Sequence, residues 1–273
     1  CNGWNPTDIF VRTYDKKKEF TKSFAFRMKT DSEKKLTRNT GFYERTSKLT
    51  RNFVDARGFW LPNDYTKHGV TNEYTACREK AVVIDLSSLR KFEILGPDAE
   101  ELMNYTLTRN IKKLSVGQIV YSAMCYENGT MFDDGTLLKL SETGFRWVCG
   151  DEYAGEWLKE QAKKKNLKVV IKNSTDQINN LSVQGPNSRK ILEKIIFTPP
   201  TQPTISELQW FRFTICRLEE LNGIPLIVSR TGYTGELGYE VWCHPDHASQ
   251  VWDKIMEVGK NDGLIPAGFG ALD

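Results

Sequence analysis

Two adjacent carboxylates, Asp133 and Asp134, follow an Asn128-Gly129 pair in a stretch of alternating side chains. Asn-Gly strongly favours a β-hairpin, because a type I′ turn requires positive φ at both central residues. Counted outward from a two-residue loop, Asp134 shares a face of the hairpin with Tyr121, whereas Asp133 points to the other face. The chemistry available to Asp134 is therefore that of a ligand-facing acid beside a tyrosine.

The same register places Ala123 opposite Asp134 and Tyr121 opposite Thr136, in strands made largely of Thr, Met, Phe and Leu. A carboxylate in such surroundings costs desolvation free energy unless a partner compensates it. This segment alone leaves two interpretations open. Asp134 is either a solvent-facing carboxylate at a sheet edge or an acid that faces a ligand.

A second candidate site lies in the glycine-rich stretch SRTGYTGELGYEVW (229–242). Gly232, Gly235 and Gly238 recur every three residues, which lets the backbone turn sharply and leaves open space nearby. The stretch contains neither the dinucleotide pattern G-x-G-x-x-G nor a lysine-bearing phosphate loop. In the strand that follows, Glu240 and Trp242 share one face.

Two interpretations of Glu240 remain open. It is either an exposed glutamate beside a tight hairpin or a carboxylate held among aromatic residues to grip a flat, amine-bearing heterocycle. A carboxylate can accept two parallel N–H bonds from such an edge, which makes recognition strong and specific.

Bulk composition excludes several classes of protein. The 273 residues suffice for two domains or one large domain, and the net charge is only +3, from 38 basic and 35 acidic residues. That balance argues against a nucleic-acid binder that works by bulk charge. No apolar run approaches the roughly 20 residues needed to span a bilayer.

The six cysteines lie far apart without a Cys-x-x-Cys pair, which disfavours a disulfide framework or zinc site and favours a reducing compartment. His244 and His247 have no third ligand nearby, so no metal site is expected. The chain begins at Cys1 without an initiator Met and ends at Asp273 within the stretch GLIPAGFGALD. We therefore expect it to be a piece of a longer polypeptide.

Local patterns indicate a mixture of helices and strands. The lysine-rich segment 1–40 is assigned no chemistry, and Asp98 is predicted to N-cap a helix containing Leu102 and Met103. Gly96-Pro97 and Gly185-Pro186 form similar strand-to-helix corners, which suggests two similarly built α+β halves. The patterns predict helices over about 41–55, 72–80, 152–165 and 246–262, an aromatic loop over 57–62, and strands over 81–86, 91–95, 145–149, 169–171, 178–183, 208–216, 223–229 and 239–243.

The motifs SRTGYTGELGYE, AMCYENGTMFDDG, VIDLSSLRKFEILGPDAEEL, SVQGPNSRKIL and IPAGFGALD together resemble the tetrahydrofolate-dependent aminomethyltransferase family. That family comprises the T-protein of glycine cleavage and its relatives, including the folate domains of dimethylglycine and sarcosine dehydrogenases and the folate-dependent demethylases. The resemblance runs from about Gly41 to Asp273, and the glycine-rich stretch is its most specific marker.

The resemblance implies an α+β fold built from two ferredoxin-like α/β-sandwich domains, with a C-terminal β-barrel that would begin after this chain stops. By the same comparison, residues 41–92 and 177–273 form a discontinuous folate-binding domain. Residues 93–176 form an inserted α+β domain that carries the Asp134 hairpin, and residues 1–40 are an extension of unknown role.

The resemblance also implies roles for individual residues. Asp134 matches the catalytic aspartate beside the reactive folate nitrogens, and Glu240 matches the glutamate that binds the pterin edge. Tyr121, Leu89 and Tyr233 match positions that line the folate pocket. The implied cofactor is tetrahydrofolate, whose N5 receives an aminomethyl, methylene or methyl unit without a covalent enzyme intermediate.

The implied partners are a small-molecule or protein-bound one-carbon donor, with a lipoyl carrier protein or a dehydrogenase as candidates, and no nucleic acid or membrane span. The implied location is the bacterial cytoplasm or the mitochondrial matrix.

The sequence departs from the T-protein pattern in two places. The segment Asp-Val-Ser-His-Met appears here as Asp85-Leu86-Ser87-Ser88-Leu89, and Ala-Arg-Asp appears as Ala271-Leu272-Asp273. Both variants are more similar to the dimethylglycine and sarcosine dehydrogenase folate domains, so the one-carbon donor stays open. The alternative is a non-catalytic folate-binding or structural subunit that retains the fold.

Overall fold

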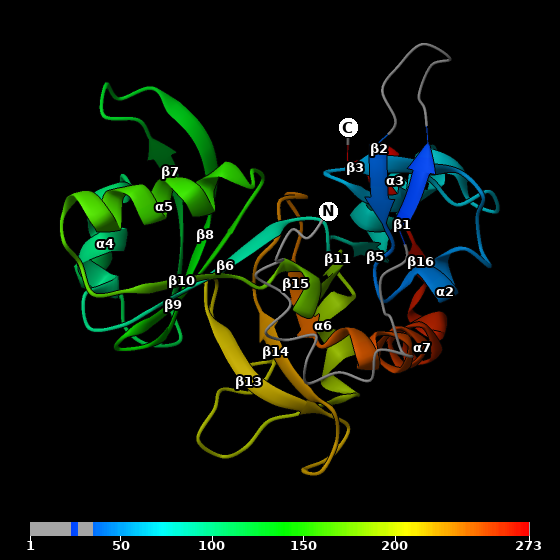
Figure 1. Ribbon diagram of the computed structural model, residues 1–273. Helices are drawn as coiled ribbons and strands as arrows, with labels where there is room; N and C mark the ends of the chain where they lie inside the picture. The colour runs from blue at the N-terminus through cyan, green and yellow to red at the C-terminus, as the bar shows by residue number, and fades with distance from the viewer. Residues whose placement is uncertain (1–22, 27–34, 273) are drawn as a thin grey trace. The chain divides into compact units, whose positions relative to one another are not determined.

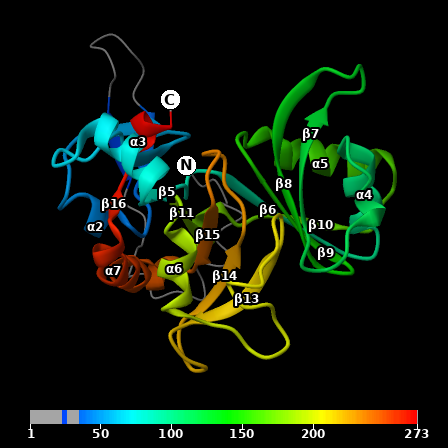
Figure 2. The same ribbon diagram turned by 180° about the vertical axis from the view of Figure 1, so that it is seen from behind.

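The computed structural model describes residues 23–26 and 35–272, and Figures 1 and 2 show it from opposite sides. The described chain forms two compact units. Unit 1 contains Leu89–Asp176, and unit 2 contains the described residues of Glu19–Ser88 and Gln177–Asp273. Most of the lysine-rich segment 1–40 lies outside the described residues.

Unit 1 is an antiparallel five-stranded sheet with two helices on one face (Figure 1). The strand order is β10-β6-β9-β8-β7. In chain order the elements are β6 (Arg90–Leu95), α4 (Ala99–Thr106), the 3-10 turn η1 (Ile111–Lys113), β7 (Ile119–Cys125), β8 (Met131–Ser141), β9 (Gly144–Cys149), α5 (Tyr153–Lys164) and β10 (Val170–Asn173).

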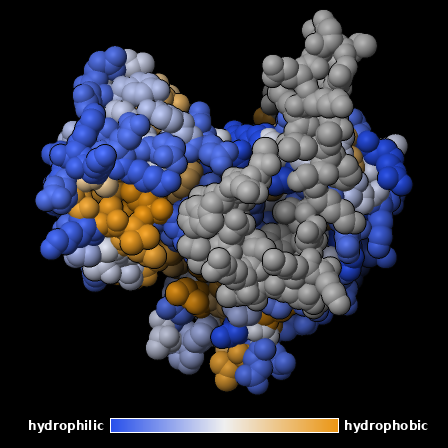
Figure 3. All heavy atoms as spheres, in the orientation of Figure 1, coloured by the Kyte–Doolittle hydropathy of each residue, from blue (hydrophilic) through white to orange (hydrophobic). Residues whose placement is uncertain are grey.

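Side-chain alternation gives this sheet two different faces. Phe92, Leu137 and Trp147 point toward α4 and α5 and form a buried apolar core with Leu102 and Leu158 of those helices. Apolar side chains also gather in one area of the surface of this unit (Figure 3). The core face is therefore fixed by apolar burial, which leaves the other face of the sheet for polar groups.

The opposite face carries buried charges as well as the predicted acid. Arg146 Nε lies 2.7 Å from Glu93 Oε1, and the Ser174 hydroxyl donates to the same oxygen at 2.8 Å. The strand registers place Tyr121 and Asp134 on this face too. Because its buried charges are paired, the face can carry them at a tolerable desolvation cost.

The β7–β8 hairpin has the predicted register but a different turn. Tyr121 pairs with Thr136, and Ala123 pairs with Asp134, which confirms both pairings. At the tip, however, the Tyr126 amide donates to the Thr130 carbonyl at 2.9 Å, so the loop has three residues rather than two. Gly129 has a φ of 84°, whereas Asn128 is not left-handed, so the predicted type I′ turn is wrong.

A β-bulge restores the register that the longer loop would otherwise shift by one residue. Cys125 pairs with Met131 and Met124 pairs with Asp133, which leaves Phe132 as the extra residue in β8. The Phe132 ring lies 5.7 Å from the Trp157 ring of α5 between centroids. The bulge residue is thus anchored to the helical side, and Asp134 remains on the open face.

Unit 2 is built on a seven-stranded sheet of order β12-β13-β14-β15-β11-β5-β16, in which only β16 and β5 are parallel. The core between this sheet and the helices α6 and α7 includes Val83, Leu181, Val241, Ile191 and Trp252. The helices and strands are α3 (Gly69–Glu79), β5 (Ala81–Asp85), β11 (Asn179–Gln184), α6 (Ser188–Glu193), β12 (Ile196–Phe197), β13 (Phe213–Leu218), β14 (Pro225–Ser229), β15 (Gly238–Cys243), α7 (Ala248–Gly259) and β16 (Leu264–Pro266). The 3-10 turns are η3 (Pro245–His247), η4 (Lys260–Asp262) and η5 (Phe269–Ala271), and η2 (Thr175–Gln177) contains the boundary between the two units.

A separate four-stranded sheet in unit 2 replaces the helix and loop predicted over 41–62. Only α2 (Tyr43–Thr46) is helical there, and β3 (Phe53–Ala56) and β4 (Phe59–Pro62) form a hairpin beside β2 (Lys35–Arg38) and β1 (Ser23–Phe26). Its two-residue turn has positive φ at both Arg57 (56°) and Gly58 (79°). The type I′ geometry expected at Asn128-Gly129 is therefore found at Arg57-Gly58 instead.

Other sequence-based assignments can be compared with the structure. The helices predicted over 72–80, 152–165 and 246–262 are confirmed as α3, α5 and α7, whereas the strand predicted over 208–216 begins only at Phe213. The Asp98 side chain makes no capping bond to α4 and instead accepts the Lys168 amide at 2.7 Å. Within residues 23–26 and 35–272, no helix combines the length and apolarity required to cross a bilayer.

The close contact of β8 with β9 predicts a strong effect of the substitution Gly135→Ala. A Cβ at Gly135 would lie 2.1 Å from the Val148 carbonyl oxygen, so the strands would have to separate. We expect a loss of about 2 kcal/mol or more in the free energy of unfolding, measured by urea denaturation. Gly129→Ala, in open space, should cost only about 1 kcal/mol for the left-handed backbone. Equal losses in the two variants would contradict the proposed cause.

Candidate functional site

Tyr121 and Asp134 meet on the open face of the unit 1 sheet. The Tyr121 hydroxyl donates a hydrogen bond to Asp134 Oδ2 from the neighbouring strand. Tyr121 is 53% exposed and Asp134 is half-buried, so both groups remain accessible. The hydrogen bond, with smaller contributions from desolvation and the carboxylate charge, raises the pKa of Tyr121 above its ordinary value of 10.0. At neutral pH the Tyr121 phenol is therefore protonated and acts as the hydrogen-bond donor of the pair.

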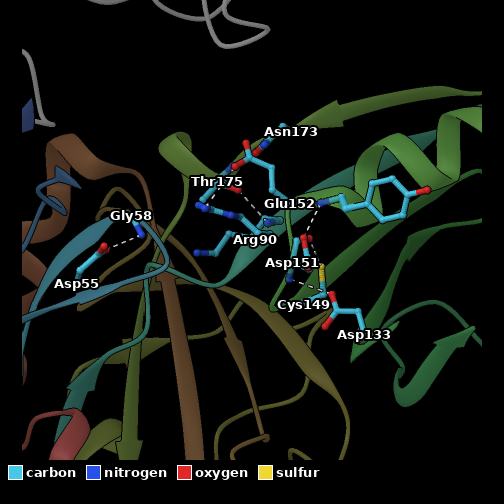
Figure 4. Close-up of polar contacts among 11 residues, drawn as sticks. Asp55, Gly58, Arg90, Asp133, Cys149, Asp151, Glu152, Asn173 and Thr175 are labelled. Carbon is cyan, nitrogen blue, oxygen red and sulfur yellow. Dashed lines mark hydrogen bonds and ion pairs between the residues drawn. The ribbon is translucent and has the colours of Figure 1, made fainter. Parts of the chain in front are cut away.

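Asp133 serves a different purpose from Asp134. Its carboxylate accepts the Asp151 amide at 3.0 Å and the Gly150 amide at 3.4 Å, in the turn that leads into α5 (Figure 4). Burial, followed by the charge of Asp133, raises the pKa of the Cys149 thiol well above its usual range. Asp133 therefore stabilises a turn on the helical side, and only Asp134 of the pair faces outward.

The start of β6 is held against the end of β10 and the start of α5 (Figure 4). Arg90 lies 3.4 Å from Glu152, and the Lys91 amide donates to the Thr175 hydroxyl oxygen at 3.1 Å. Leu89 precedes this anchored strand and is half-buried. These contacts fix the backbone beside Leu89, whose role in lining a pocket stays a prediction.

Glu240 is buried in unit 2, so the interpretation as an exposed glutamate is wrong. Glu240 is 7% exposed and lies in β15, directly opposite Ser229 of β14. The Thr231 hydroxyl donates to Glu240 Oε2 at 2.8 Å. A carboxylate that accepts one hydroxyl bond still has lone pairs with which it can accept N–H groups from a ligand.

Tyr233 lies in the electrostatic neighbourhood of Glu240. The residue is 58% exposed, yet desolvation of its hydroxyl and then the charge of Glu240 raise its pKa to about 12, against an opposing effect of Arg57. Arg57 comes from the β3–β4 turn. The predicted residues thus form two pairs, Tyr121–Asp134 in unit 1 and Tyr233–Glu240 in unit 2.

The glycine-rich connection is packed against Gln184 rather than beside open space. A Cβ atom added to Gly232 would lie 2.3 Å from the Gln184 side-chain oxygen, and a Cβ atom added to Gly238 would lie 1.9 Å from the same oxygen. The Gln184 amide nitrogen donates to the Thr231 carbonyl at 3.2 Å, and the Thr234 hydroxyl donates to its oxygen at 2.8 Å. The prediction of open space is therefore wrong for two of the three glycines, whose absent side chains let Gln184 hold the loop.

Asn180 is a polar residue of this region that sequence reasoning missed. It lies in β11 opposite Trp242, on the sheet face that carries Glu240. The side chain is fully buried, and among the described residues neither its oxygen nor its nitrogen finds a hydrogen-bond partner. A buried amide of this kind calls for a water or a polar ligand. The available signal was the Asn179-Asn180 pair at the start of a predicted strand.

Comparison with known proteins identifies the family. Residues 42–273 match the family model described as the GCVT N-terminal domain. The chain belongs to this family. Within it, the trimethylamine-oxide aldolase of Ruegeria pomeroyi is 53% identical over 273 residues, which is 100% of this chain and 35% of that protein. The aminomethyltransferase of Alkaliphilus metalliredigens is 36% identical over 223 residues, which is 81% of this chain and 58% of that protein.

Solved structures show the fold of this GCVT N-terminal domain. The glycine cleavage system aminomethyltransferase T from Bartonella henselae matches with a TM-score of 0.73 and 24% identity, over 86% of this chain and 60% of that chain. The heterotetrameric sarcosine oxidase from Corynebacterium sp. U-96 matches with a TM-score of 0.52 and 11% identity, over 82% of this chain and 95% of one of its chains. The chain thus has the mixed α+β fold of the T-protein and spans 35–58% of the length of the two curated relatives.

The Tyr121–Asp134 bond predicts a change in tyrosine ionisation. Asp134→Asn removes the carboxylate that stabilises the neutral phenol, so the pKa of Tyr121 should fall toward 10.0. Absorbance titration at alkaline pH, compared with the same titration of Tyr121→Phe, isolates this one group. Asp133→Asn is the matched control, because Asp133 points to the other face. An unchanged Tyr121 titration in Asp134→Asn would contradict the pairing.

Proposed function

We propose that the protein is a tetrahydrofolate-dependent one-carbon transferase. The observation that carries this proposal is the accessible Tyr121–Asp134 pair in a chain of the GCVT N-terminal domain family. The relatives named above are enzymes, and their names describe an aldolase and an aminomethyltransferase. A carboxylate with a phenol donor, open on one side, suits the acceptance of a proton during transfer.

The polar groups of unit 2 fit the flat, amine-bearing edge of a reduced folate. Glu240 offers a buried carboxylate as an acceptor of N–H groups, and Asn180 offers an amide with both donor and acceptor atoms in need of partners. Tyr233 adds an exposed aromatic ring. This combination of acceptor, amide and ring suits a heterocycle better than a simple anion.

Each residue would have a separate role. Bound tetrahydrofolate would supply the nucleophilic nitrogen that receives the one-carbon unit. Asp134 would take up the proton released during the transfer and stabilise positive charge that develops beside it. Tyr121 would hold the Asp134 carboxylate in one orientation through its hydrogen bond. Glu240 would accept N–H groups of a ligand through its buried carboxylate.

A more specific donor is suggested by the relative with 53% identity, whose name describes an aldolase acting on trimethylamine oxide. Cleavage of trimethylamine oxide into dimethylamine and formaldehyde balances in atoms. It needs no added oxidant, because the N–O bond is reduced while a methyl carbon is oxidised. We therefore propose that the one-carbon unit handled by this protein is at the oxidation level of formaldehyde.

Folate binding and turnover can be separated by two substitutions. Tetrahydrofolate or folinic acid should quench the tryptophan fluorescence of the protein with micromolar affinity. Asp134→Asn should retain most of this affinity but lose about 100-fold or more in turnover. Glu240→Gln should weaken binding about 10-fold, because the strong ionic acceptor becomes a neutral amide.

The same measurements have clear contrary outcomes. Neither quenching nor a thermal shift in the unsubstituted protein would exclude the folate assignment. Folate binding without turnover of any donor would favour the non-catalytic alternative. Normal turnover of Asp134→Asn would remove Asp134 from the mechanism.

The donor can be identified by a substrate screen. The protein is incubated with tetrahydrofolate and one of trimethylamine oxide, free formaldehyde, dimethylglycine, sarcosine, the glycine-cleavage carrier protein, or methylated sulfur or aromatic compounds. We expect methylene-tetrahydrofolate, detected by mass spectrometry, with formaldehyde or trimethylamine oxide. Methyl-tetrahydrofolate from a methylated donor would contradict transfer at the formaldehyde level. Asp134→Asn serves as the matched inactive variant.

A further inference from the structure

A chain of hydrogen bonds runs through unit 2 and ends at Glu240. The Trp242 indole nitrogen lies 3.1 Å from Ser229 Oγ, and Ser229 Oγ lies 2.7 Å from Thr231 Oγ1. Thr231 Oγ1 in turn lies 2.8 Å from Glu240 Oε2. All four residues are buried, at 7% exposure or less. We refer to Trp242, Ser229 and Thr231 as the hydroxyl relay.

With Glu240 ionised, the direction of every bond in the hydroxyl relay follows from its two ends. An indole N–H can only donate, and Thr231 uses its single hydroxyl hydrogen on the Glu240 carboxylate. The hydrogen between Ser229 and Thr231 must therefore belong to Ser229. Three donors thus point the same way, and each bond polarises the next toward the carboxylate.

The relay is built into the sheet rather than assembled by flexible side chains. Ser229 lies directly opposite Glu240 in the β14–β15 ladder, and Trp242 is the next residue of β15 on the same face. Thr231 follows the end of β14 and is held by the Gln184 bond to its carbonyl. The rotamers of all four side chains are therefore constrained by the backbone register.

We propose that Thr231 and Ser229 are positioning residues that hold Glu240 as an ionised acceptor, and that they thereby restrict its ligand to a heterocyclic edge of N–H donors. This inference rests on the proposed folate function and deepens it. Because the relay supplies only donors, it stabilises the carboxylate form of Glu240 over its protonated form. A ligand edge that presents a carbonyl would meet a second acceptor there, whereas an amino group beside a ring N–H is complementary.

The decisive comparison uses a matched set of threonine substitutions. Thr231→Val removes the hydroxyl while keeping the shape of the side chain, and should weaken folinic acid binding about 10-fold, which is no more than the loss expected for Glu240→Gln. Thr231→Ser keeps the hydroxyl and should restore most of the affinity. Thr214→Val makes the same chemical change in β13, where the buried hydroxyl has no hydrogen-bond partner among the described residues, and should leave the affinity unchanged.

The ligand side of the proposal has its own comparison. An analogue of folinic acid in which the 2-amino group is replaced by methyl keeps the ring N–H but lacks the amino donor, so the carboxylate can no longer accept two parallel N–H bonds from it. We expect Thr231→Val to change the affinity for this analogue by about 3-fold or less, because the coupled interaction is already lost. Equal weakening for folinic acid and the analogue would overturn the restriction to N–H donors.

A readout without ligand tests the relay by itself. The Trp242 indole N–H resonance is assigned as the signal missing from Trp242→Phe in a proton–nitrogen correlation spectrum. Ser229→Ala should move this resonance strongly, Thr231→Val should move it less, and Thr214→Val should leave it in place. An unmoved resonance in both relay variants would overturn the relay.

The outcomes distinguish the relay from the function on which it rests. If the unsubstituted protein fails to bind folinic acid while the indole resonance responds as expected, the folate proposal fails and the relay stands. If folinic acid binds but Thr231→Val and Thr231→Ser behave alike, the role of the hydroxyl is overturned and folate binding stands.

Discussion

The two-residue side-chain period of a β-strand is the constraint on which the candidate site depends. A shift of one residue in the β7–β8 pairing would exchange the faces of Asp133 and Asp134. The structure differs from the predicted hairpin in two ways, a loop of three residues instead of two and an extra residue in β8 at Phe132. The two differences shift the register in opposite directions, so Ala123 still pairs with Asp134. Because Phe132 is packed on the α5 side by Trp157, apolar contacts on one face control which carboxylate reaches the other.

The two candidate carboxylates illustrate how burial changes the use of one chemical group. Asp134 and Glu240 each accept a bond from a hydroxyl, yet Asp134 shares an accessible surface with Tyr121, while Glu240 is enclosed with Thr231. Water can reorient around the first carboxylate. The second has lost that freedom, and its fixed donors favour one charge state and one orientation. The first is suited to proton transfer, and the second is suited to recognition.

Sequence reasoning succeeded where one local rule dominated and failed where tertiary contacts decided. The register at Asp134 was predicted correctly although the turn was not, because the bulge cancelled the longer loop. The loop expected over 57–62 is instead the turn and second strand of a hairpin, since Arg57 adopts a left-handed conformation that is uncommon for its residue type. Asp98 likewise bonds to the Lys168 amide, a partner 70 residues away. Alternation placed Glu240 beside Trp242, but the hydroxyls that connect them come from another strand and from the glycine-rich connection. The domain boundaries remain predictions, and so do the roles of the five site residues (Leu89, Tyr121, Asp134, Tyr233 and Glu240).

The contact of Gln184 with Gly232 and Gly238 also limits how this protein can change over evolutionary time. A side chain at either glycine would occupy the position of the Gln184 amide, so a larger residue there requires Gln184 to move or to be replaced first. Neighbouring positions whose side chains face outward, such as Tyr233 at 58% exposure, can change without meeting Gln184. A library for directed evolution of new specificity would leave the glycines fixed and randomise that position first.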